Sequence, residues 1–216
     1  YPDPMEVMHR YGAYAMRYYL MSSPVVRAEN LRFNEKEVAD VGKKFINIMR
    51  NVSSFYGLYK EHDDGRAPLG AHVLDAWILA RLNETLKIET EAMEEYDLQT
   101  AARVLQGFVT DFSTWYIRRS RDRMKEEGED RLEALATMRH TLETFSKMLA
   151  PFMPHLSEII YQDIEGGFLG SDERNSVHLE YWPEAGETDQ EIIDQMGEAR
   201  AIVSRALDIR EEAGRA

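Results

Sequence analysis

The stretch LQTAARVLQGFVTDFSTWYIRRSRDRMK, residues 98–125, decides the fold class of this chain. On a helical wheel of about 100° per residue, its apolar side chains share one arc: Ala101, Leu105, Phe108, Val109, Phe112, Trp115 and Tyr116. An apolar stripe of this length predicts a long amphipathic helix packed against other helices.

The same helix carries a cluster of arginines that point in several directions, so they cannot all face one ligand. Arg119 and Arg123 follow Trp115 along the apolar arc, where the stripe leaves the core. We expect these three residues to lie at a helix or domain junction, with the arginines paired to acids or carbonyls. Arg118 and Arg121 point elsewhere and are free to meet solvent or phosphate groups.

Long helical patterns with short connections occupy most of the remaining sequence. Working outward, the predicted helices cover about 34–59, 71–95 and 98–125, then 130–150 and 154–164, with further helices near 2–20 and after 189. Residues 176–182, SVHLEYW, are expected to be extended. The sequence therefore predicts an all-α protein, an antiparallel bundle of five to six long helices with a short extended segment near the C-terminus.

The composition is that of an acidic globular protein. Of 216 residues, 39 are Asp or Glu and 26 are Lys or Arg, which gives a net charge of −13; all of the acidic excess lies after residue 60, because residues 1–60 carry a balance of +3. No apolar run approaches the ~20 residues of a membrane span, and there is no secretory signal. The absence of cysteine excludes disulfides and thiolate metal sites and permits a cytosolic location. Because the chain opens with YPDP rather than Met, we expect a fragment of a longer protein.

The helix predicted over 34–59 has a basic and amide-rich face opposite its apolar arc. That face holds Lys36, Asp40, Lys43, Asn47, Arg50, Asn51 and Ser54, with Lys44 nearby. Lys and Arg attract phosphates, while Asn and Arg hydrogen-bond the exposed edges of unpaired bases. An ordinary solvated helix face is the alternative interpretation.

No catalytic motif stands out. The sequence has no glycine-rich phosphate loop, serine nucleophile elbow or zinc-binding H-E-x-x-H pattern. His62, Asp63 and Asp64 could hold a metal, but a solvated turn is the simpler interpretation. The residues alone therefore indicate a binding module, with a helical protein-interaction scaffold that does not bind RNA as the alternative.

Several segments, in this order, resemble class I aminoacyl-tRNA synthetases. Residues 1–33 resemble the segment that follows the KMSKS loop of those enzymes. DAWILARLN, the stretch from YDLQTAARV to WYIRRSR, PFMPHLSEIIYQ and SVHLEYWP resemble the anticodon-binding helical domain. WYIRRSR and SVHLEYWP indicate the isoleucyl-tRNA synthetases rather than their valyl and leucyl relatives, which remain the alternative. Tyr14 and Ala76 depart from the family's usual YGADALR and DRWIL patterns, and we expect both to concern packing.

The resemblance implies three parts: 1–33 links the catalytic domain to the bundle, 34–185 is the anticodon-binding bundle, and 186–216 begins a truncated C-terminal helical extension. It implies a parent enzyme that charges tRNA-Ile with isoleucine using ATP and Mg²⁺. This fragment lacks the catalytic motifs, needs no cofactor and is inactive alone. Its implied partners are the tRNA-Ile anticodon stem-loop and the catalytic domain of the same polypeptide, in a cytoplasmic monomer that contacts no membrane.

The family's anticodon-reading segment matches KKFINIMRNVSSF, residues 43–55. The candidate tRNA-binding residues are accordingly Lys43, Lys44, Asn47, Arg50, Asn51 and Ser54, together with Arg118 and Arg121.

Overall fold

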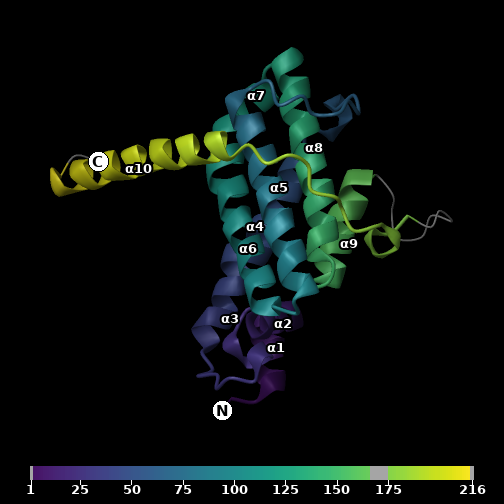
Figure 1. The fold of residues 1–216 in the computed structure, drawn as a ribbon, viewed down its shortest axis with the longest axis vertical. Coiled ribbons are helices and arrows are strands. Elements are labelled where there is room, and N and C mark those ends of the chain that lie inside the picture. Colours follow the sequence, from purple (N-terminus) through teal and green to yellow (C-terminus); the bar gives the residue numbers. More distant parts are fainter. Residues whose placement is uncertain (1, 166–174, 215–216) are drawn as a thin grey trace.

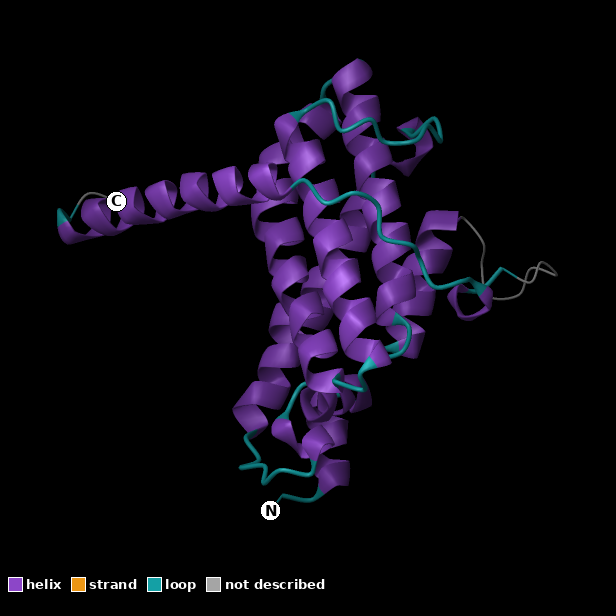
Figure 2. Cartoon of the chain, in the orientation of Figure 1, coloured by secondary structure: helices purple, strands orange, loops and turns teal. Residues whose placement is uncertain are grey.

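The computed structural model describes residues 2–165 and 175–214, and the regular structure in these ranges is helical (Figure 2). No β-strand occurs within them. The helices are α1 (Pro4–Tyr11), α2 (Ala13–Met21), α3 (Glu35–Val41), α4 (Asn47–Gly57), α5 (Val73–Glu94), α6 (Leu98–Thr110), α7 (Arg118–Lys125), α8 (Glu129–Leu149), α9 (Pro154–Glu165) and α10 (Gln190–Glu212). A π-helical turn over Gly42–Ile46 joins α3 to α4, and a second over Asp111–Ile117 joins α6 to α7.

Antiparallel helical rods lie side by side along the long axis of the molecule (Figure 1). The chain runs up through α3–α4, down through α5, up through α6–α7 and down through α8. Helices α1 and α2 lie at one end of this bundle, α9 packs beside α8, and α10 projects sideways from it. The all-α antiparallel bundle predicted from the sequence is confirmed.

Glycine divides the first predicted helix into two. At Gly12 the backbone has a φ of +91°, a value that residues with a β-carbon rarely adopt, so α1 ends and α2 begins in a new direction. Helix α2 is then fastened to the bundle. Arg17 donates from Nε to the Phe152 carbonyl at 2.9 Å and from Nη2 to the Pro151 carbonyl at 3.0 Å.

The π turn at 111–117 moves the buried stripe of the α6–α7 rod by one residue. Phe112 and Tyr116 are fully buried, as the sequence wheel predicts. Beyond the turn the buried positions are Ser120 and Met124, not Arg119 and Arg123. A π turn closes an i→i+5 hydrogen bond and contains one residue more than an α turn. A helical wheel drawn with a constant angle per residue therefore assigns the residues after the turn to the wrong face of the helix.

The core is a continuous set of aromatic and aliphatic side chains between the rods. Phe108 stacks on Phe112 and Phe145 with ring centres 5.8 and 5.3 Å apart, and Tyr18 carries this packing to Phe45 at 4.7 Å. Each fully buried ring contributes about 1.5–3 kcal/mol to stability. This packing fixes the α3–α4 rod so that its opposite face meets solvent.

The segment SVHLEYW is only partly extended. Val177–Leu179 form a 3₁₀ turn, and the extended chain resumes at Glu180, with φ −77° and ψ 152°. In the described part of the chain, no helix combines the length and the apolar character that crossing a membrane requires.

Candidate nucleic-acid interface

The polar face predicted on the 34–59 helix is exposed except at Asp40, which is half-buried. Phe45, Met49 and Val52 on the opposite side are at most 3% exposed, so the rod cannot rotate without uncovering them. The exposed face belongs to the π turn and to α4 and consists of Lys43, Lys44, Asn47, Arg50, Asn51 and Ser54. We call these six residues the α4 face. Because π turns within helices often occur at functional sites, the one that carries both lysines fits this assignment.

Most polar side chains of the α4 face have no hydrogen-bond or ion-pair partner among the described residues. Within residues 2–165 and 175–214, the side chains of Lys43, Asn47, Arg50 and Asn51 make no hydrogen bond or ion pair. Lys44 differs, because its ammonium lies 2.9 Å from Asp40 and its hydrogen bond lowers the pKa of that carboxyl. The face therefore offers two unpaired cations and two free amides to a partner.

Arg121 lies beside the α4 face, whereas Arg118 has no recorded contact with it. The Arg121 guanidinium carbon is 5.5 Å from the centre of the Phe55 ring, which follows Ser54 on α4. Arg118 is exposed one turn earlier on the same rod. Arg121 therefore contacts α4 at Phe55, next in sequence to the last residue of the α4 face.

Trp115 and Arg119 lie where α10 meets the bundle. The indole Nε1 donates to the Met196 sulfur at 3.1 Å, and the Arg119 guanidinium carbon lies 3.2 Å from the indole centre. Arg200 of α10 approaches the same ring at 5.3 Å. Partial burial, together with the charges of Arg118 and Arg200, lowers the pKa of Arg119. Sequence analysis did not identify the α10 residues of this contact, because their partner lies about eighty positions earlier.

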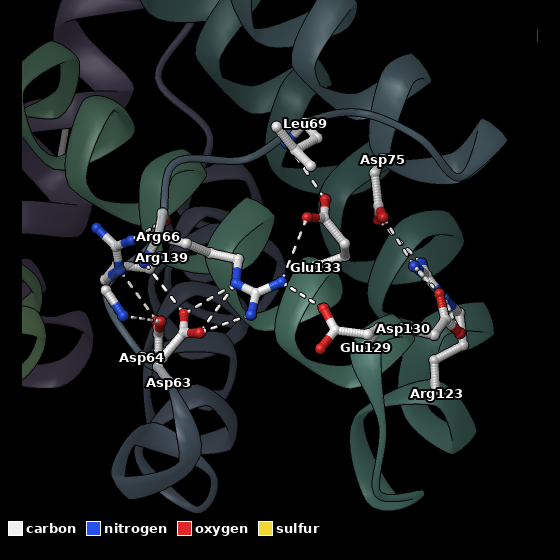
Figure 3. Close-up of polar contacts among 11 residues, drawn as sticks. Asp63, Asp64, Arg66, Leu69, Asp75, Arg123, Glu129, Asp130, Glu133 and Arg139 are labelled. Carbon is white, nitrogen blue, oxygen red and sulfur yellow. Dashed lines mark hydrogen bonds and ion pairs between the residues drawn. The ribbon is translucent and has the colours of Figure 1, made fainter.

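Arg123 is bound within the bundle (Figure 3). Its guanidinium makes two hydrogen bonds to Asp75, at 2.9 and 2.7 Å, and pairs with Asp130 at 2.6 Å. The Tyr116 hydroxyl also donates to Asp75, at 2.8 Å. Burial alone would lower the pKa of Arg123, but the hydrogen bonds to the two carboxylates raise it above its usual value. The arginine thereby connects α7 to α5 and to the start of α8.

The loop over 63–69 is held against this end of the bundle by ion pairs (Figure 3). Arg139 of α8 donates to Asp63 at 2.9 Å, and Arg66 pairs with Asp64 and Glu129, each at 2.7 Å. The side chain of Asp63 is only 4% exposed, so the interpretation of this stretch as a solvated turn is wrong for that side chain. In the described ranges, no group of three potential metal ligands occurs.

The fold agrees with the comparisons to known proteins. The family described as "Anticodon-binding domain of tRNA ligase" matches residues 75–216. The chain belongs to this family of anticodon-binding domains.

Nearly the whole chain is similar in sequence to isoleucine–tRNA ligases. That of Chlamydia abortus is 36% identical over 222 residues, covering 98% of this chain and 21% of the ligase. That of Nocardia farcinica is 36% identical over 212 residues, covering 97% of this chain and 19% of the ligase. The chain thus spans about a fifth of the length of the ligases that it resembles.

A solved structure has the same fold. It is the agnB2 LeuRS of Agrobacterium radiobacter K84, in a ternary complex with tRNA and LeuAMS. The match has a TM-score of 0.61 at 16% identity and covers 89% of this chain and 21% of that one. At this identity the likeness concerns the fold alone.

Proposed function

We propose that this chain binds the anticodon stem-loop of tRNA-Ile as part of an isoleucine–tRNA ligase. The observation that carries the proposal is the α4 face, where unpaired cations and amides lie together on a rod that the core holds in place. Its segment is also the one that resembles the anticodon-reading part of the synthetases.

The chemistry of this face suits an RNA loop better than a protein surface. Unpaired anticodon bases expose their hydrogen-bonding edges, which the free amides of Asn47 and Asn51 can address. Lys43 and Arg50 lie among them and can neutralise the flanking phosphates. Arg121, on the neighbouring rod, extends the positive charge past Ser54. Since the whole chain carries a charge of −13, we expect the affinity to depend on this local arrangement.

The rest of the proposal concerns the parent protein. Residues 1–33 link its catalytic domain to the bundle of 34–185, and 186–216 begin a further helical extension, with Trp115 and Arg119 at the junction. The parent, a cytoplasmic monomer, charges tRNA-Ile with isoleucine using ATP and Mg²⁺, whereas this chain supplies binding alone. The hydrogen bonds from Arg17 to the carbonyls of Pro151 and Phe152, just after α8, and the docking of α10 support these connections.

The test is the affinity of this chain for tRNA-Ile at ~50 mM salt, where phosphate contacts are strong. The Asn47→Ala/Arg50→Ala/Asn51→Ala variant should lose most of the binding and keep the helical circular dichroism of the parent chain. A matched control, Gln195→Ala/Ser204→Ala/Arg205→Ala, removes one arginine and two polar groups from exposed positions of α10. If the first variant binds as tightly as this control, the α4 face is not the reading surface.

A further inference from the structure

A groove of about 500 Å³ lies where the α4 face meets the α1–α2 corner and α9. Its volume is within the roughly 300–1,000 Å³ of sites that hold small molecules. Three residues of the α4 face, Lys43, Asn47 and Arg50, form one wall of this groove. The opposite walls bring in residues that the sequence did not connect with α4: Arg10 from α1, Tyr14 from α2 and His155 from α9.

The groove has an unusual charge for so acidic a chain. Arg10, Lys43 and Arg50 line it, and none of the described residues that line it is an Asp or Glu. The nearest recorded carboxylate contact is on the rim, where Glu35 pairs with Arg10 at 2.9 Å. A second groove, between α2, α3 and α6, includes Glu37 and Asp40 beside its cations. The positive charge of the first groove is therefore not balanced from within, which favours an anionic occupant.

Aromatic and apolar surfaces lie beside these cations. The rings of Tyr14 and His155 are 5.4 Å apart at a tilt of 55°. Ile46, Leu156 and the half-exposed Ile159 provide aliphatic surface in the same groove. Rings beside cations are the combination with which proteins hold single-stranded nucleic acid, since each base presents a face for stacking and each phosphate a charge.

We propose that this groove takes one unstacked nucleotide of the bound RNA. Its base lies on the Tyr14 and His155 rings with Asn47 at its polar edge, and its phosphate lies among Arg10, Lys43 and Arg50. The inference rests on the proposed function, because three of these residues belong to the α4 face. It adds that α1, α2 and α9 also recognise the RNA, so the reading surface is a groove rather than one side of a helix.

The test uses residues of the groove that are outside the α4 face. His155→Ala and Tyr14→Asp should each weaken binding of tRNA-Ile about 5- to 150-fold, the range for removing one base stack. Tyr14→Phe keeps the ring and should bind like the parent chain. Tyr181→Asp makes the same change of charge at a tyrosine that is 93% exposed and outside the groove, and it should also bind normally. Unchanged helical circular dichroism shows that each variant is folded, and His155→Ala tests the proposal by itself if Tyr14→Asp unfolds.

A fluorescent base separates stacking from a structural effect. With 2-aminopurine at each loop position of the anticodon stem-loop in turn, one position should be quenched on binding. Saturating amounts of His155→Ala should leave that position unquenched. If the α4 triple variant loses binding while His155→Ala and Tyr14→Asp bind tRNA-Ile as tightly as Tyr181→Asp, the groove does not hold a nucleotide and the proposed function stands. If the parent chain binds no tRNA, both are wrong.

Discussion

Replacing Arg123 by methionine tests the buried ion pair that connects α5, α7 and α8. The Asp75 carboxylate is fully buried and accepts two hydrogen bonds from Arg123 and one from Tyr116. Methionine keeps much of the side-chain volume but leaves this carboxylate without a cation. Removing one partner of a buried pair costs about 3–5 kcal/mol. For a chain of this size, that free energy lowers the melting temperature by about 6–20 °C.

The assay is urea unfolding followed by helical circular dichroism. Arg118→Met is the matched control, because that arginine is exposed on the same helix, and it should cost less than ~0.5 kcal/mol. Adding Asp75→Asn to Arg123→Met removes the uncompensated charge and should recover much of the lost stability. If Arg123→Met unfolds at the urea midpoint of Arg118→Met, or if Asp75→Asn gives no recovery, the ion pair does not stabilise the bundle.

Further predictions concern a buried acid, the α10 contact and a helix cap. Burial raises the pKa of Glu89, whose carboxyl oxygens lack a described hydrogen-bond partner. As the pH rises, Glu89 therefore ionises in the unfolded chain before it ionises in the folded chain, and the free energy of unfolding falls above pH ~4.3. Glu89→Gln should therefore unfold at higher urea than the parent chain at pH 8 and at similar urea at pH 4. Trp115→Ala removes the contact with Met196 and should speed amide exchange across 190–200, while α8 stays protected. Hydrogen bonds from Arg27 and Thr100 lower the pKa of Asp97, the cap of α6. Asp97→Ala should lower the urea midpoint at neutral pH, with a deficit that shrinks below pH ~3.9.

The helices and their buried faces could be predicted because apolar residues recur at helical spacing. Phe45 and Met49 on one rod, and Phe108 and Phe112 on another, are buried as that spacing requires. The π turns could not be predicted, since an extra residue in one turn leaves no mark on composition. For that reason Ser120, rather than Arg119, follows Tyr116 into the core.

The candidate site could be predicted only where it lies on one helix. Asn47 and Arg50 are close in sequence, so a helical wheel places them on the same face. His155 lies about a hundred positions later and reaches the same groove only because α9 packs beside α4. Asp63 and Arg139 are 76 positions apart, and no local pattern predicts that they pair.

Recognition of the anticodon loop is tested by the binding of the isolated anticodon stem-loop of tRNA-Ile across a salt series. We predict saturable binding at ~50 mM salt, with log affinity falling against log salt by about 0.7–0.9 for each phosphate contact. A hairpin made from the acceptor stem of the same tRNA should bind much more weakly. Equal binding of the two RNAs would show that the chain does not read the anticodon loop, and no saturable binding of either would favour a helical scaffold that does not recognise RNA.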